Sequence, residues 1–215
     1  MAKLRIYKFP DLVLAKKASP IVRVEKPLQK LADDMLETMY AAPGVGLAAN
    51  QVGILQRILV IDVDYDLEDL PEDPSASLGV EVIGKSIIKN KKPQIVINPE
   101  IVYREGNILY SEGCLSVPEY SAEVKRSEKI KVQFLDMDGL TRTLSAEGLL
   151  SVAIQHEMDH LDGKLFIDRL SPLKKEMVKK KLRQERTLRD AEDVEGHGTD
   201  PSPVLKKKKH KKAYQ

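Results

Sequence analysis

One short segment constrains the fold of this 215-residue chain more than any other: Gln155-His-Glu-Met-Asp-His160. Two histidines four residues apart lie one helical turn from each other, so both imidazoles can bind one metal ion from the same helix face. Glu157 lies near that face and can take a proton from a metal-bound water without being a ligand. Two chance surface histidines are a weaker explanation, because the whole chain has four histidines. The apolar spacing predicts a helix from Leu149 to Leu161 that ends before Gly163.

A hydrolytic site of this kind needs a third protein ligand and an open coordination position. One protease pattern places a histidine where this chain has Phe166, which cannot bind a metal. Glu176 lies in a lysine-rich stretch and His197 in a polar tail, so an upstream ligand is favoured over both. Cys114 is the single cysteine of the chain. A lone cysteine is by default a small buried apolar residue, but a thiolate with two imidazoles suits Fe(II), Zn, Ni or Co and would complete the site.

A glycine-rich segment lies upstream, Gly44-Val-Gly-Leu-Ala-Ala-Asn-Gln51. Its first six residues match a dinucleotide-binding fingerprint, but that fingerprint follows a strand and opens a helix. Here a predicted helix precedes it and a predicted strand follows, which excludes a Rossmann interpretation. The glycines instead favour a backbone that passes close to a bound extended ligand, and Gln51 can supply an amide donor.

The remaining pattern predicts an α+β fold, with most strands early and two strong helices late. Residues 65–93 are acidic first and basic last and are predicted to be an inserted loop, with a short strand around Val80 to Ile83. Residues 1–189 would form a single catalytic domain, and the Lys-rich residues 190–215 a disordered tail. Helices are predicted at Pro27–Tyr40 and Leu173–Arg189, and strands at Ile58–Val63, at Gln94–Asn98 and on both sides of Asp138-Gly139.

Composition excludes several classes of protein. Hydrophobic residues make up 42% of the chain, enough for a folded core. A single cysteine allows no internal disulfide, and we expect no disulfide partner. The chain has no signal-peptide pattern and no run of about 18 apolar residues, so we expect a cytoplasmic protein that does not enter a membrane.

Three motifs in this order resemble those of peptide deformylases: Gly44 to Gln51, Glu112-Gly-Cys-Leu-Ser116, and Gln155 to His160 with Leu161 and Gly163. The resemblance runs from about Leu4 to about Arg186 and does not cover residues 65–93 or the tail. It implies antiparallel sheets packed around a central metal-binding helix, with a basic C-terminal helix. It also implies a metal-dependent hydrolase that removes the formyl group from the N-terminal N-formylmethionine of newly synthesised proteins and releases formate.

The same resemblance assigns roles to individual residues. One divalent metal ion per chain, usually Fe(II) in this family with Zn, Ni or Co as substitutes, would be held by Cys114, His156 and His160. Glu157 would be the general base and acid, and the Gln51 side chain and the Leu115 backbone N–H would bind the formyl oxygen. The peptide would be bound by Val45, Gly46, Leu149, Val152 and Ala153. A charged network that orients the ligands would comprise Glu112, Arg126 and Asp159.

Two other functions remain open. A general metallo-endopeptidase shares the His-Glu-x-x-His pattern, although Phe166 disfavours its simplest ligand set. A ribosome- or RNA-binding module with an inactive site is suggested by residues 173–215, which hold fourteen Lys or Arg and seven Asp or Glu. Clustered lysines bind phosphate backbones regardless of sequence. We favour an active enzyme whose basic helix and tail help it to remain near the ribosome.

Overall fold

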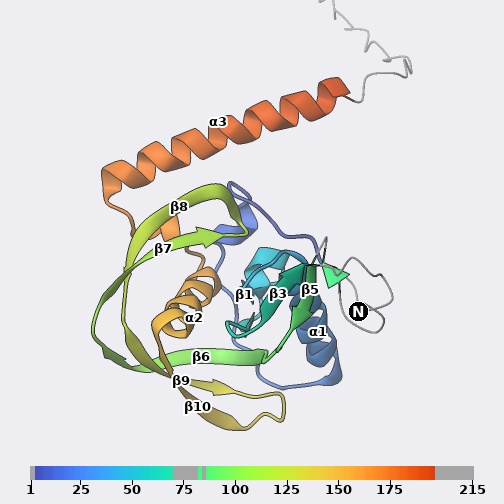
Figure 1. Ribbon diagram of the computed structural model, residues 1–215, viewed down its shortest axis with the longest axis vertical. Helices are drawn as coiled ribbons and strands as arrows, with labels where there is room; N and C mark the ends of the chain where they lie inside the picture. Colours follow the sequence, from blue (N-terminus) through green and yellow to red (C-terminus); the bar gives the residue numbers. More distant parts are fainter. Residues whose placement is uncertain (1–2, 70–81, 84–85, 197–215) are drawn as a thin grey trace, which may run out of the picture.

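The computed structural model describes residues 3–69, 82–83 and 86–196 (Figure 1). Its α-helices are α1 (Lys26–Ala41), α2 (Gly148–Leu161) and α3 (Pro172–Gly196). Short 3-10 helices lie at η1 (Leu12–Ala15), η2 (Ala49–Val52) and η4 (Phe166–Arg169). The strands are β1 (Gly46–Ala48), β2 (Ile58–Ile61), β3 (Asp66–Asp69), β4 (Val82–Ile83), β5 (Ser86–Lys89), β6 (Gln94–Glu105), β7 (Ile108–Cys114), β8 (Val117–Arg126), β9 (Lys129–Leu135) and β10 (Thr141–Glu147).

The strands form three antiparallel sheets. The helix α2 lies near the centre of the molecule, between the largest sheet and the β7-β8 hairpin, whereas β3 and β5 lie beside α1 (Figure 1). The largest sheet has the strand order β1-β2-β6-β9-β10, the second is the β7-β8 hairpin, and the third has the order β3-β5-β4. Antiparallel strands joined by short turns need no crossover helices, so the helices are free to fill the space between sheets. The predicted α+β fold with antiparallel sheets and a basic C-terminal helix is confirmed.

The centre of the molecule is built on α2, whose sequence is apolar on more than one face. Ile154 and Leu161 are fully buried and pack with Leu59 of β2 and Val132 of β9. A helix that is buried on several sides has its backbone and side chains fixed from several directions. Because α2 carries both motif histidines, this packing holds the candidate site rigidly.

The first helix and the last helix pack in different ways. In α1, Met35 and Met39 are fully buried and contact the core that includes Ile58 of β2. In α3, Val178 and Leu182 pack against the β7-β8 hairpin, and the helix then extends beyond the body (Figure 1). Among the described residues, no helix combines the length and apolar character required to span a membrane.

Three parts of the structure differ from the sequence-based expectation. The predicted inserted loop contains a small sheet in which β3 pairs with β5, in addition to a strand at Val82–Ile83. The β7-β8 hairpin was not predicted. The helix α3 continues to Gly196, past the predicted end at Arg189, so the first residues of the expected tail are helical. Residues 197–215 lie outside the described part of the chain, and the expected disorder there and the domain limits stay predictions.

Candidate metal centre and substrate pocket

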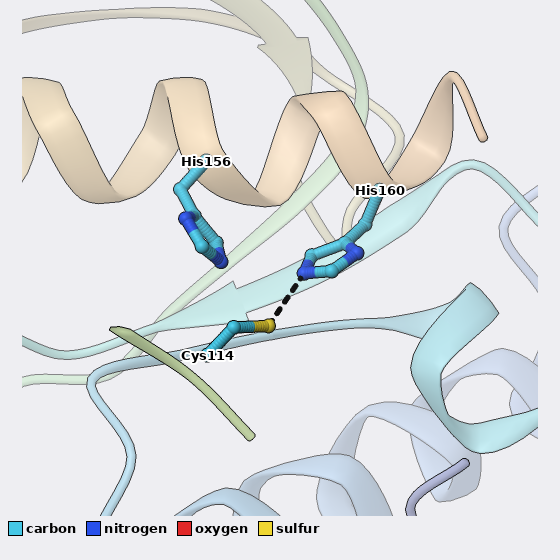
Figure 2. A group of neighbouring side chains, drawn as sticks. All are labelled: Cys114, His156 and His160. Atoms are coloured by element: carbon cyan, nitrogen blue, oxygen red, sulfur yellow. Dashed lines mark hydrogen bonds between the residues drawn. The ribbon is translucent and has the colours of Figure 1, made fainter. Parts of the chain in front are cut away.

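Three potential metal ligands converge beside α2. His156 and His160 lie one turn apart, with ring centroids 5.0 Å from each other, and both point toward Cys114 at the end of β7 (Figure 2). One donor atom from each of the three residues lies within 4.8 Å of the others, and the Cys114 Sγ is 3.2 Å from the His160 Nε2. Both histidines are buried whereas Cys114 is half-buried, so the group can hold a metal ion at the edge of the core.

The position of Cys114 depends on an irregularity in the β7-β8 hairpin. The pairing shifts between Glu112 and Cys114, and such a bulge turns the following side chain away from the regular alternation. The Ser116 backbone N–H donates to the Cys114 Sγ at 3.4 Å, which holds the sulfur in place beside the histidines. Phe166, which replaces a histidine of the protease pattern, stacks on His156 at 6.0 Å instead. In the described part of the chain, Glu176 belongs to no cluster that could hold a metal ion, and His197 lies outside it.

A buried charge network orients His156. The Glu112 Oε2 lies 2.8 Å from the His156 Nδ1, which leaves the Nε2 of that ring for a metal. Arg126 is fully buried and donates two hydrogen bonds to Glu112, at 2.6 and 2.8 Å, and a third to Asp159 at 2.6 Å. Arg169 of η4 donates two more bonds to Asp159, both at 2.5 Å. The structure therefore brings Glu112, Arg126 and Asp159 together, and Arg169 adds a further contact to Asp159. The surface-like sequence around Arg169 gave no signal for this contact.

The charges of this network favour a cation at the site. Burial alone would raise the pKa of Glu112, but hydrogen bonds from Arg126 and His156 lower it below the ordinary value. Burial alone would lower the pKa of His156, but Cys114 and Glu112 raise it well above the ordinary value. Burial lowers the pKa of His160, which stays neutral as a metal ligand must be. Surroundings that stabilise a proton on His156 also stabilise a metal ion in its place.

Glu157 has the properties of a proton-transfer group. Its carboxyl is buried, and this desolvation raises its pKa from 4.5 to about 7. Among the described residues, its Oε2 has no hydrogen-bond partner, so this oxygen is available to a water or substrate atom. Gly46 of β1 makes the close approach possible, because a Cβ at this position would lie 2.6 Å from the Glu157 Oε1. A group with a pKa near neutrality can both accept and donate a proton at physiological pH.

Gln51 presents its amide group to the same site. Its Oε1 accepts the Ala48 backbone N–H at 2.8 Å, which fixes the orientation of the side chain. Its Nε2 then points toward the hairpin, 3.2 Å from the Ser116 Oγ and 3.7 Å from the Cys114 Sγ. A donor beside the metal ligands is placed to stabilise negative charge on a substrate oxygen.

A cavity of about 500 Å³ connects these groups. All five residues predicted to bind the peptide line it, together with Gln51, Leu115 and Glu157; the five are Val45, Gly46, Leu149, Val152 and Ala153. Of the three residues predicted to orient the ligands, Glu112 lines the cavity, whereas Arg126 and Asp159 do not. The sequence did not predict the cavity wall that β7 forms. Its lining residues Tyr110, Ser111 and Gly113 belong to a strand that was not predicted.

The α+β fold and a cysteine–two-histidine centre beside a buried glutamate define the class of the protein: a metal-binding hydrolase. The model of the polypeptide deformylase family matches residues 3–176, and the chain belongs to this family. Membership of this family confirms the resemblance seen in the motifs. It is therefore favoured over the hypothesis of a general metallo-endopeptidase.

Individual relatives agree with this assignment. The chain is 50% identical over 185 residues to peptide deformylase 2 of Xanthomonas campestris pv. campestris, covering 85% of this chain and 95% of that protein. It is 51% identical over 189 residues to a peptide deformylase of Xylella fastidiosa strain 9a5c, covering 86% and 98%. A crystal structure of a peptide deformylase from Legionella pneumophila matches with a TM-score of 0.69 and 39% identity, covering 88% of this chain and 98% of that one. One from Ehrlichia chaffeensis in complex with actinonin matches with a TM-score of 0.69 and 37% identity, covering 86% and 98%.

Proposed function

We propose that this chain removes the formyl group from the N-terminal N-formylmethionine of newly synthesised proteins and releases formate. The observation that carries this proposal is the buried Glu157, with a pKa of about 7, beside three convergent metal donors and a peptide-sized cavity. Cys114, His156 and His160 would hold one divalent metal ion. When bound, this ion supplies Lewis-acid activation of a water molecule at neutral pH.

The side chains and backbone of the site would each have a separate role in the reaction. Glu157 accepts the proton of the attacking water and later donates it to the amine of the leaving methionine. The Gln51 amide and the Leu115 N–H donate hydrogen bonds to the formyl oxygen as its negative charge develops. Each such donor is worth about 3–4 kcal/mol in comparable acyl-transfer sites.

The pocket would select the substrate through its shape and apolar wall. Leu149, Val152 and Ala153 come from α2, on the side of the helix that carries His156, and line the cavity. An unbranched apolar side chain such as that of methionine can fill a pocket of this kind. Val45 and Gly46 would lie along the peptide backbone on the other side.

The decisive test is formate release from a short N-formyl-methionyl peptide by protein purified without oxygen, with and without a chelator. The unformylated peptide serves as the control. Rapid release that the chelator abolishes supports the proposal. No release from protein that holds one equivalent of metal would refute it.

We propose ferrous iron as the native metal, because a thiolate and two imidazoles suit Fe(II), with Zn, Ni and Co as alternatives. Elemental analysis of protein purified anaerobically from its own cells would identify the metal. Zinc, nickel or cobalt in stoichiometric amount would contradict this choice, and active protein free of metal would refute the whole scheme.

We also propose that the basic C-terminal end brings the enzyme to the ribosome in the cytoplasm, where its substrates emerge. Lys174, Lys180 and Lys181 of α3 are exposed, on a helix that extends beyond the body. Ribosome cosedimentation at low and moderate salt, with the full chain and with residues 190–215 removed, tests this. Equal pelleting of both forms would exclude the tail from binding, and salt-independent pelleting would contradict a phosphate-directed contact.

A further inference from the structure

The segment 65–93, which the deformylase motifs do not explain, is joined to the wall of the substrate cavity at its first residue. The Tyr65 hydroxyl donates a hydrogen bond to the Gly44 carbonyl at 3.2 Å. The Tyr65 ring packs edge-on against Tyr40 of α1, with centroids 5.2 Å apart. Figure 1 shows β3 and β5, which belong to this segment, beside α1. Gly44 lines the cavity, so Tyr65 contacts the wall from its outer side.

The end of the same segment is joined to this wall through Asp62. The buried Asp62 carboxylate accepts the Tyr40 hydroxyl at 2.6 Å and the Lys92 backbone N–H at 2.7 Å. The backbone N–H of Asp62 donates to the Val45 carbonyl at 2.9 Å. The carbonyls of Gly44 and Val45 are therefore both held, one by the start of the segment and one by a residue that binds its end.

The wall that these bonds fix touches the catalytic groups directly. A Cβ on Gly44 would lie 2.9 Å from the Leu115 Cδ1, so the Gly44 backbone already rests against Leu115. Two residues later, Gly46 rests against Glu157 in the same way. A change in the position of Gly44 thus alters the width of the cavity between the segment that leads into β1 and the end of β7.

We propose that Tyr65 is a positioning residue for the substrate peptide: its hydroxyl sets the place of the Gly44 carbonyl and so the wall along which the formylated peptide lies. The inference rests on the proposed function and deepens it by assigning a role in substrate binding to Tyr65, the first residue of the segment 65–93. The ring of Tyr65 packs against the α1 core and serves stability. The hydroxyl serves positioning, and the two roles separate in Tyr65→Phe, which keeps the ring.

The test compares the parent, Tyr65→Phe and the matched control Tyr103→Phe with the same substrate, N-formyl-Met-Ala-Ser. Tyr103 is on β6, and its hydroxyl bonds Glu105 at 2.6 Å on an exposed surface. For Tyr65→Phe we expect KM to rise about three- to tenfold, the range that corresponds to one hydrogen bond, with kcat within about twofold of the parent. The product peptide Met-Ala-Ser, titrated calorimetrically, should bind more weakly by the same factor. Tyr103→Phe should change none of these values.

Each outcome has one meaning. If the parent releases formate and Tyr65→Phe has unchanged KM and product affinity, the positioning role of Tyr65 is refuted and the proposed function stands. A fall in kcat at constant KM refutes it as well, because positioning of the peptide would then not be the role. A parent that releases no formate refutes the proposed function itself.

Discussion

Gly46→Ala should disable the enzyme without removing its metal, because the substitution displaces one carboxylate. Gly46 is buried in β1 and pairs with Ile61 of β2, so its backbone is held by the sheet. A Cβ built on Gly46 would meet three atoms of Glu157, at 2.6, 2.8 and 2.9 Å. Ordinary contacts of a Cβ lie at 3.4–4 Å, so the Glu157 carboxylate must move by about 0.8 Å to relieve the overlap.

The expected loss of activity follows from the size of this displacement. A misplacement of about 1 Å in a reacting group costs on the order of 100-fold in rate. Overpacking of a core by one methyl group costs about 1–3 kcal/mol of unfolding free energy. We therefore expect kcat/KM of Gly46→Ala to fall about 100-fold while the protein stays folded. The metal content should remain one equivalent, because the three atoms closest to the new Cβ all belong to Glu157 rather than to a metal ligand.

The assay measures formate release, metal content and urea unfolding for the parent, Gly46→Ala and the control Gly139→Ala. Gly139 lies in the turn between β9 and β10 at φ +73°, and the nearest described atom to its Cβ would be the Val24 Cγ2 at 4.0 Å. The control should lose about 1–2 kcal/mol of stability from the left-handed backbone alone and keep full activity. If Gly46→Ala retains the parent kcat/KM, the position of Glu157 does not limit the reaction, and the reasoning is wrong.

Three more perturbations test other parts of the site. Glu157→Gln should keep its metal by elemental analysis but lose about 10²–10⁴-fold in formate release, since the proton acceptor is gone; a variant with parental turnover would exclude Glu157 as the base. Arg126→Met should cost about 3–5 kcal/mol in urea unfolding, because the buried Glu112 and Asp159 lose their shared partner, and a loss below 1 kcal/mol would contradict that dependence. The pKa of Asp168 is lowered from 3.8 to about 2, because hydrogen bonds from lysines of α3 and a backbone N–H outweigh the opposing effect of burial. Asp168→Asn should therefore lose up to about 2 kcal/mol at pH 7, and the difference should vanish as pH falls from about 4 to about 2; a difference independent of pH would refute the ionic origin.

The helices could be predicted from the sequence because their period is long and regular. The pattern predicted α2 at Leu149–Leu161, and the structure has Gly148–Leu161. It predicted α1 at Pro27–Tyr40, and the structure has Lys26–Ala41. In both helices, apolar residues recur over several turns, and buried packing follows directly from that recurrence.

A short strand was predicted around Val80 to Ile83, and the structure has β4 at Val82–Ile83. The strand β3 of the same segment escaped prediction because its residues disfavour strands. β3 has the sequence Asp66-Leu-Glu-Asp69, and acidic residues are depleted in sheets. The complementary charges across the pair offset this, since Lys89 of β5 binds Glu68 at 2.5 Å. Such a pairing depends on a partner some twenty residues away, which a local pattern does not contain.

The β7-β8 hairpin escaped prediction for a reason that bears on function. In β8 the buried positions alternate along Ala122, Val124 and Arg126, so an arginine occupies a position where the pattern requires an apolar residue. Physics alone would place this side chain at the surface, because an unpaired buried charge costs several kcal/mol. Its burial is possible because Glu112 and Asp159 bind it from two sides, and Glu112 in turn holds the ring of His156. The interruption of the apolar pattern thus marks the point where the core is built to orient a metal ligand. It hides β8, the strand whose pairing with β7 brings Cys114 close to that ligand.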